Sequence, residues 1–218
     1  MKAVVFDMDG VIFDSEILVI RVWERVAERH GIEDIEATCM QCLGVNREGS
    51  RRIFMNRYGE SFPYEAYQKE VRALFHEMAD GGKLPQKPGI RELLLYLREQ
   101  EIPTAVASST SCDVVCRELE EGGLLDYFNI VIGGDKVRKS KPEPDIFLLA
   151  CEELHVLPED TWVIEDSYNG IRAAARAGTH PIMVPDLMEP TDEIRSLTDY
   201  VLPSLHEVKE LFKSLRPV

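Results

Sequence analysis

The chain has 218 residues, 44% of them hydrophobic, and its 39 acidic residues against 25 basic ones give a formal charge of −14. This length and apolar content allow one or two domains with a buried core, which excludes intrinsic disorder. The negative charge disfavours nucleic acid and anionic lipid as partners, and we find neither a signal peptide nor an apolar run of about 18 residues. We therefore expect a cytoplasmic, monomeric protein with no nucleic-acid or membrane partner.

The chain contains five cysteines, an odd number that fits a reducing compartment better than a disulfide framework. Cys39 and Cys42 form a Cys-x-x-Cys pair, which could bind zinc or take part in redox chemistry. Zinc usually takes four ligands, and the sequence has no second close pair of that spacing. Buried or half-buried thiols are therefore the favoured interpretation.

The N-terminal part of the chain begins with a short apolar run, Ala3 to Phe6, which is typical of a strand buried on both faces. A helix is predicted next, with Ser15 as its N-cap and Gly31 as its C-terminal stop. Its apolar residues recur at helical spacing: Val19, Val22, Trp23, Val26 and Ala27.

The following segments, to about Gly82, are also predicted to be helical. Asn46 can cap a helix that ends near Gly59, and Pro63 can open another. No strand is predicted between Asp14 and Leu84.

A stretch rich in Gly and Pro, residues 81–89, is typical of a linker. Beyond it, helices and strands alternate: helix 90–101, strand 104–107, helix 113–121, strand 130–132, helix 145–155, strand 162–164, helix 169–177 and strand 182–184. Strands separated by helical crossovers predict an α/β fold with a parallel sheet covered on both faces. We expect residues 1–14 and 85–218 to form this core and residues 15–84 to form an all-helical insert.

Polar residues follow four of the predicted strands, at the edge where open parallel sheets bind their ligands. They are Asp7 and Asp9 after the first strand, Ser108 and Ser109 after the second, Lys141 in the loop after the third, and Glu165 and Asp166 after the fourth. Taken singly, each could be an ordinary turn, cap or surface residue. Together they supply carboxylates for a metal ion, hydroxyls and a cation, which are the groups needed to hold a phosphoryl group.

Other phosphate and metal motifs are absent from the sequence. It has no G-x-x-x-x-G-K-[ST] or G-x-G-x-x-G segment, and His76-Glu77 lacks the second histidine of a zinc-protease helix. Asp7-x-Asp9 could begin a calcium loop, but Ile12 stands where that loop needs glycine.

In combination, four segments resemble the haloacid dehalogenase superfamily, in particular its phosphatases and β-phosphoglucomutase-like enzymes with an inserted helical cap. The segments are Asp7-Met8-Asp9-Gly10-Val11 with Asp14-Ser15, Ala107-Ser108-Ser109, Ser140-Lys141-Pro142 with Pro144, and Glu165-Asp166-Ser167 before Asn169-Gly170-Ile171. The resemblance covers essentially the whole chain. It implies a Rossmann-like core with a cap domain inserted after the first strand.

The resemblance implies a role for each residue of this edge. Asp7 is expected to be the nucleophile and Asp9 the general acid and base, while Ser108, Ser109 and Lys141 bind the phosphate. Mg²⁺ is expected at the Asp7 carboxylate, the Asp9 backbone carbonyl and Asp166, with Glu165 as a ligand or a helper. Independently of the family, a carboxylate that attacks phosphorus is repelled by the charge of the phosphate, which explains the need for a metal ion and a fixed ammonium.

Asp9 favours a phosphate ester as the substrate, because it can protonate an alkoxide leaving group and then deprotonate the attacking water. A small phosphorylated metabolite, a sugar phosphate above all, is expected. In the predicted insert, Arg47 resembles the cap arginine that meets a distal phosphate or sugar oxygen, although a solvated arginine in the first turn of a helix is an equal alternative.

The motifs so far are compatible with either a phosphatase or a mutase activity. The mutases have a histidine five residues after the equivalent of Asp14, whereas this chain has Val19. We therefore expect a Mg²⁺-dependent phosphatase that acts through an aspartyl-phosphate, with a β-phosphoglucomutase-like mutase as the alternative enzyme. A non-catalytic phosphometabolite-binding protein is an alternative of another class.

Overall fold

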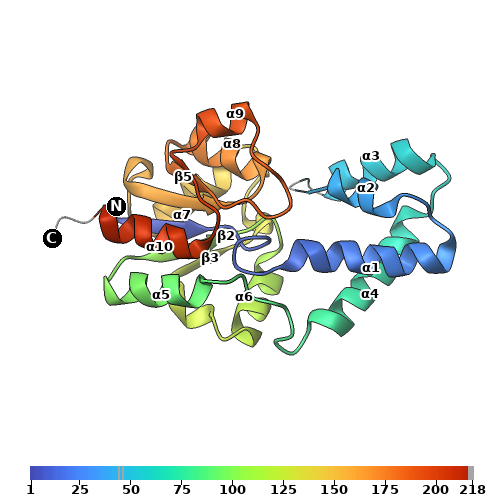
Figure 1. The fold of residues 1–218 in the computed structure, drawn as a ribbon, viewed down its shortest axis with the longest axis horizontal. Helices are drawn as coiled ribbons and strands as arrows, with labels where there is room; N and C mark the ends of the chain where they lie inside the picture. Colours follow the sequence, from blue (N-terminus) through green and yellow to red (C-terminus); the bar gives the residue numbers. More distant parts are fainter. Residues whose placement is uncertain (44, 46, 216–218) are drawn as a thin grey trace.

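The protein folds around a six-stranded parallel sheet, as the computed structural model shows for residues 1–43, 45 and 47–215 (Figure 1). The strands are β1 (Ala3–Phe6), β2 (Thr104–Ala107), β3 (Ile130–Ile132), β4 (Thr161–Glu165), β5 (His180–Met183) and β6 (Tyr200–Val201). Their order in the sheet is β3-β2-β1-β4-β5-β6, so the chain leaves β1 first toward one edge and later toward the other. The expected α/β fold with a parallel sheet is confirmed.

Alternate residues of the strands pack on opposite faces of the sheet, because successive side chains point to opposite sides. Val4 and Phe6 of β1 lie in one apolar cluster with α5 (Ile90–Glu99), α6 (Cys112–Glu121) and α10 (Leu205–Ser214). Val5 lies in a second cluster with α7 (Asp145–Glu153) and α8 (Tyr168–Ala177). The sheet is therefore covered by helices on both faces. A short helix, α9 (Asp192–Leu197), precedes β6 and packs on α8.

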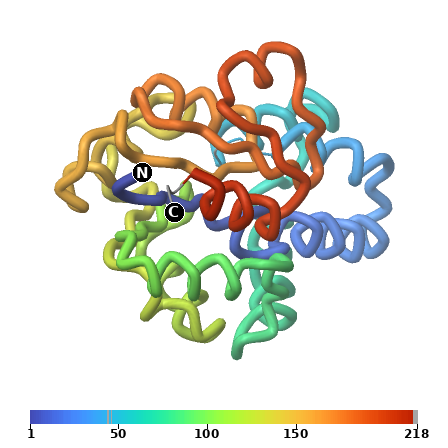
Figure 2. The backbone as a smooth tube through the Cα atoms, turned by 60° about the vertical axis from the view of Figure 1, so that its left-hand side comes forward, coloured from blue at the N-terminus to red at the C-terminus, as the bar shows by residue number. Residues whose placement is uncertain are grey.

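The first four of the helices that lie between β1 and β2 in sequence form a group on one side of the sheet, as the blue to teal segments of Figures 1 and 2 show. They are α1 (Ser15–His30), α2 (Ile35–Met40), α3 (Arg47–Tyr58) and α4 (Tyr64–Ala79). Aromatic side chains hold them to one another: the rings of Trp23 and Phe54 are 4.5 Å apart, and those of Phe54 and Tyr64 are 5.1 Å apart. We propose that residues 15–84 form a cap and that residues 1–14 and 85–218 form the core.

The two segments that connect these helices to the sheet run side by side. The Asp14 amide donates to the Pro85 carbonyl at 2.8 Å, and the Lys87 amide donates to the Ile12 carbonyl at 2.9 Å. Across the same pair, the Lys87 ammonium lies 3.7 Å from the Asp14 carboxylate. These contacts tie the two connections to each other at the boundary between the proposed core and cap.

Several sequence expectations need correction. Ser15 is the first residue of α1 and not its N-cap, because its hydroxyl donates to Asp9 rather than to the helix amides. Strand β5 begins two residues earlier than expected, and β6, α9 and α10 were not predicted. Strand β6 has only two residues, too few for a recognisable alternation. The proposed cap residue Asn46 lies outside the described residues.

The structure adds one observation on membrane spans and one on the thiols. No helix in the described residues is long and apolar enough to cross a membrane. All five cysteines are free thiols, and burial raises the pKa of both Cys39 and Cys42.

Candidate active site

The strand order places four functional segments at one edge of the sheet. Strand β1 lies between β2 and β4, with Phe6 in register with Val106 and with Ile164. Residues that follow these three strands therefore emerge beside one another, at the point where the order of the strands reverses. Asp7, Ser108 and Glu165 consequently lie near one another, although they are far apart in sequence.

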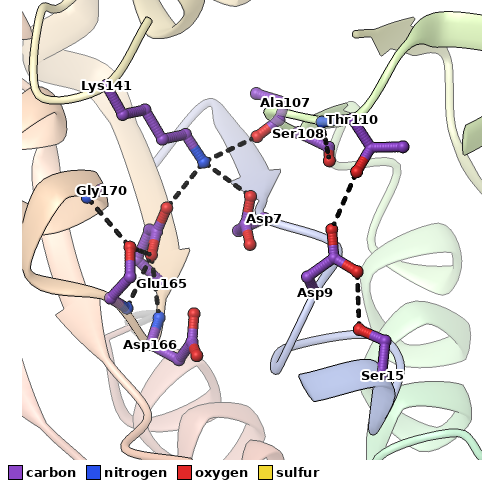
Figure 3. Close-up of polar contacts among 11 residues, drawn as sticks. Asp7, Asp9, Ser15, Ala107, Ser108, Thr110, Lys141, Glu165, Asp166 and Gly170 are labelled. Atoms are coloured by element: carbon purple, nitrogen blue, oxygen red, sulfur yellow. Dashed lines mark hydrogen bonds and ion pairs between the residues drawn. The ribbon is translucent and has the colours of Figure 1, made fainter. Parts of the chain in front are cut away.

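Lys141 is the centre of the polar network at this edge (Figure 3). Its ammonium donates to Asp7 Oδ1 at 2.6 Å, to Glu165 Oε1 at 2.7 Å and to the Ala107 carbonyl at 3.0 Å. Lys141 is only 8% exposed, so these contacts replace its lost hydration. Burial by itself lowers the pKa of Lys141, but the charges of Asp7 and Glu165 outweigh this effect and raise the pKa above its usual value.

Glu165 is fully buried and holds the loop after β4 in place. Its Oε2 accepts hydrogen bonds from the Asp166 amide, the Ser167 amide and the Ser167 hydroxyl, all between 2.9 and 3.0 Å. Gly170 leaves room for this carboxylate, because a Cβ at that position would lie 1.7 Å from Glu165 Oε1. Glu165 is therefore engaged on both oxygens by the protein itself.

Asp9 faces the same edge from the other side of Asp7 (Figure 3). Its Oδ1 accepts a hydrogen bond from the Ser15 hydroxyl at 2.6 Å, and its Oδ2 accepts one from the Thr110 hydroxyl at 3.2 Å. Ser15 belongs to α1 and Thr110 follows β2, so the orientation of Asp9 depends on both parts of the molecule. A carboxyl group held by two hydroxyls can keep one orientation while it gains or loses a proton.

Two groups of carboxylates in the described part of the chain are close enough to share a metal ion, and both include Asp166. Asp7, Glu165 and Asp166 form one group, and Glu16, Asp166 and Asp186 form the other; within each, the oxygens lie within 4.8 Å of one another. Burial raises the pKa of Asp7 to about 7 and that of Glu16 to about 8, and it holds the pKa of Asp166 well above its usual range. So many buried carboxylates require a cation or protons.

Gly10 shows how closely the chain is built around Asp166. Its φ of +78° lies in the left-handed region, and a Cβ there would stand 2.2 Å from Asp166 Oδ2. Only glycine satisfies both conditions without displacing the carboxylate. The Asp-x-Asp-Gly segment therefore brings β1 directly against the carboxylate that follows β4.

The residues after β2 form the side of the site next to Asp9. Ser109 and Thr110 line the cavity, whereas the Ser108 side chain is fully buried and its hydroxyl accepts a hydrogen bond from the Thr110 amide at 3.0 Å. The predicted phosphate-binding residues Ser108, Ser109 and Lys141 thus lie at one edge, with Ser109 and Lys141 on the cavity wall and Ser108 behind it.

A cavity of about 440 Å³ extends from this edge to the helices α1, α2, α3 and α4. Arg47 at the start of α3 lines this cavity. Its guanidinium donates to Glu65 of α4 at 2.6 Å, and both side chains are more than half exposed. Exposed ion pairs contribute about 0–1 kcal/mol, so this pair does not fix the position of Arg47.

Comparison with known proteins agrees with this geometry. The family model described as haloacid dehalogenase-like hydrolase matches residues 4–184. The chain belongs to this family. The match spans the segment from β1 to the end of β5 and includes Asp7, Asp9, Ser108, Lys141, Glu165 and Asp166, whereas Asp186 lies just beyond it.

Individual members of the family resemble the chain over most of its length. A phosphorylated carbohydrates phosphatase of Thermotoga maritima is 36% identical over 84% of both chains, and a beta-phosphoglucomutase of Bacillus subtilis is 31% identical over 98% of this chain and 97% of its own. The solved structure of CbbY from Rhodobacter sphaeroides in complex with phosphate superposes with a TM-score of 0.78 at 27% identity, covering 95% and 96% of the two chains. Within the haloacid dehalogenase-like family, this chain is a phosphoric monoester hydrolase.

For four residues that the structure places at this candidate site, no role was predicted from the sequence: Ser15 as a partner of Asp9, Thr110 at the end of the second strand, Glu16 and Asp186. Glu16 directly follows the recognised Asp14-Ser15 segment, and its place in the first turn of a helix that starts at the strand ends was a usable signal. Asp186 follows β5 in the same way that Asp166 follows β4. The position of a carboxylate just after a strand is therefore informative even where no known motif marks it.

Proposed function

We propose that the protein is a Mg²⁺-dependent phosphatase of small phosphorylated carbohydrates that acts through an aspartyl-phosphate on Asp7. The observation that supports this most is the contact between Lys141 and Asp7 Oδ1 at 2.6 Å, at the end of the central strand. It fixes one oxygen of Asp7 and leaves Oδ2 to attack phosphorus. The named activity of the Thermotoga relative supports the carbohydrate class.

The residues present fit a divalent cation. Five carboxylates line the cavity, Asp7, Asp9, Glu16, Glu165 and Asp166, against two cations, Lys141 and Arg47, in the described residues. A phosphate dianion would not enter such a site without further positive charge. Hard divalent cations prefer anionic oxygen ligands, so the Asp7 carboxylate, the Asp9 carbonyl and Asp166 are the proposed ligands.

Glu165 is better suited to position Lys141 than to bind the cation, because its oxygens already accept from Lys141, two amides and the Ser167 hydroxyl. When bound, Mg²⁺ would offset the charge on the phosphoryl oxygens. Lys141 would also offset this charge, as a point charge shared between Asp7 and the phosphate.

The chemistry then needs two steps from the chain's own residues. Asp7 Oδ2 attacks phosphorus while Asp9 gives its proton to the leaving alkoxide. Asp9, now a carboxylate held by Ser15 and Thr110, takes a proton from the water that hydrolyses the aspartyl-phosphate. Ser109 and backbone amides of the same loop are the proposed ligands of the phosphoryl oxygens, with Ser108 supporting that loop from behind.

The mutase alternative is not favoured. A mutase must hold a phosphosugar in two orientations and keep water from the intermediate, which requires polar groups on the cap. Val19 stands where the mutases have a histidine, and it lines the cavity. The non-catalytic alternative leaves the buried contact between Lys141 and Asp7 without a purpose.

Hydrolysis of p-nitrophenyl phosphate with and without Mg²⁺ tests the proposal first. We expect turnover only with the metal, and release of inorganic phosphate at the rate of substrate loss for sugar phosphates. Conversion of β-glucose 1-phosphate to glucose 6-phosphate with little free phosphate would contradict it.

A further inference from the structure

The cavity has two unlike walls. The core wall consists of polar and charged groups at the strand ends, among them Asp7, Asp9, Thr110 and Lys141. The cap wall is apolar, with few exceptions: it contains Val19, Ile20, Trp23, Cys39, Cys42, Leu43, Val45 and Phe54. A substrate with its phosphate at the core wall must therefore place its other end against apolar side chains.

Helix α1 shows where the cavity lining changes from polar to apolar. Its residues that line the cavity are Ser15, Glu16, Val19, Ile20 and Trp23, which form one stripe from the strand ends into the cap. An α-helix rises about 1.5 Å per residue, so the stripe is about 12 Å long and becomes apolar about 4.5 Å beyond Glu16. The polar zone next to the phosphate is thus about one helical turn deep.

Beyond Ser15 and Glu16 in the first turn of α1, the polar side chains on the cap wall in the described residues are Arg47, Ser50 and Gln68, and each has a partner in the cap. Arg47 donates to Glu65, Gln68 donates to the Tyr64 hydroxyl at 3.0 Å, and Ser50 is hydrogen-bonded to the Cys42 thiol. Three polar side chains among eight apolar ones offer few hydrogen-bonding groups, so a ligand with many hydroxyls would lose more hydrogen bonds to water on this wall than it regains. Burying a hydroxyl without a hydrogen bond is unfavourable.

Resting on the proposed phosphatase function, we propose that the site selects monophosphates whose leaving group is polar next to the phosphate and poor in hydroxyls at its far end. Deoxy-sugar phosphates and nucleoside 5′-monophosphates share this chemistry. Hexose phosphates, which carry a hydroxyl on nearly every carbon, are discriminated against by the cap wall.

The test compares kcat/KM for four esters with Mg²⁺ present. 2-Deoxyribose 5-phosphate and ribose 5-phosphate differ by one hydroxyl, uridine 5′-monophosphate replaces the anomeric hydroxyl by a ring, and glucose 6-phosphate retains all its hydroxyls. We expect the deoxy sugar, the nucleotide or both to exceed glucose 6-phosphate at least about tenfold. The deoxy sugar shows whether loss of a hydroxyl alone is sufficient for the preference, and the nucleotide shows whether a ring is required.

The variant Val19→Thr checks that the cap wall is responsible. It adds a hydroxyl with almost no change of shape on an exposed helix position, 37% exposed, so the protein should fold normally. We expect the preference over glucose 6-phosphate to shrink at least about threefold. Val114→Thr is the matched control, since Val114 is half-buried on helix α6 and does not line the cavity; its preference should remain that of the parent.

The outcomes separate the two proposals. Glucose 6-phosphate hydrolysed as well as or better than the other esters would overturn the preference while the phosphatase function stands. An unchanged preference in Val19→Thr would overturn the role of the cap wall. Absence of phosphate release from all four esters and from p-nitrophenyl phosphate would overturn the proposed function, and the preference with it.

Discussion

The edge of the sheet and the cap wall differ in how tightly their polar groups are held. At the sheet edge, Lys141, Glu165 and Asp166 are 8% exposed or less, and Lys141 and Glu165 are bonded to several partners each. On the cap wall, Arg47 is more than half exposed and has one ion pair with another exposed residue. Fixed, buried charges are suited to one chemical step. Substitutions among the loosely held residues of the cap wall can alter which substrate is bound and leave that chemical step intact. The contrast predicts large effects from substitutions at the edge and small, substrate-dependent effects from substitutions in the cap.

The largest expected effect is that of Asp7→Asn, which removes the nucleophile at the centre of the edge. An amide oxygen is a poor nucleophile, so we expect kcat to fall at least about 10³-fold for every substrate. Steady-state kinetics with p-nitrophenyl phosphate and a sugar phosphate measures it. Asp126→Asn is the control and should retain full activity, since Asp126 is exposed on the surface of the core domain.

Asp9→Asn should lower kcat by about 10²–10⁴-fold, because an amide can neither protonate the leaving alkoxide nor activate water. For esters with a good leaving group, such as p-nitrophenyl phosphate, the rate of phosphoenzyme formation should fall less. Rapid-quench measurement of phosphoenzyme formation and decay resolves the two steps. Equal rates in the variant and the parent would remove Asp9 from the mechanism.

The carboxylate cluster predicts that metal-free protein loses stability as the pH rises. Asp7 and Glu16 have folded-state pKa values of about 7 and about 8, above their ordinary values near 4, so the folded state binds more protons than the unfolded state between these limits. The free energy of unfolding should therefore fall from about pH 4 to pH 8. Mg²⁺ should reverse the loss, by about 2.7 kcal/mol at a hundredfold excess over its Kd.

Asp166→Asn tests whether this cluster is the metal site. The substitution removes a buried charge, so the stability of the metal-free variant should depend less on pH. Its Tm should no longer rise on addition of Mg²⁺. Thermal unfolding at pH 5 and pH 8, with and without the metal, gives both results. A Tm increase equal to that of the Asp126→Asn control would show that the cation binds elsewhere.

The smallest expected effect is that of Arg47→Ala in the cap. The ion pair with Glu65 is exposed, so stability should change by less than about 1 kcal/mol. If Arg47 meets the substrate, KM for a sugar phosphate should rise a few-fold while hydrolysis of p-nitrophenyl phosphate stays the same. Arg52→Ala, exposed on the same helix, is the control; identical KM values in the two variants would assign Arg47 to the solvated surface.

The sequence predicted the core of the fold well because parallel strands buried on both faces leave clear apolar runs. Strand β1 and strand β2 were predicted with the bounds that the structure shows, and Gly31 ends α1 in the left-handed conformation. The end of the chain was missed for different reasons. Strand β6 is too short to show a pattern, whereas α10 has Leu205, Val208 and Phe212 at helical spacing after Ser204 and could have been found.

The candidate site was predictable where a residue directly follows a strand, because strand ends meet at one edge regardless of their distance in sequence. Side-chain pairing was not predictable in the same way. Ser15 fits an N-cap by residue type, yet in the structure its hydroxyl binds Asp9, and no local pattern distinguishes these alternatives. Asp186 joins Asp166 only through the pairing of β5 with β4, a tertiary contact.

The central claim, that Asp7 accepts the phosphoryl group, is tested most directly by acid quenching during turnover of a ³²P-labelled sugar phosphate, followed by peptide mapping. The Asp9→Asn variant should extend the lifetime of the intermediate. We predict acid-stable, hydroxylamine-sensitive label on the peptide that contains Asp7, forming no more slowly than phosphate is released. Phosphate release at the normal rate with no label on that peptide, in the parent and in the variant, would contradict the account.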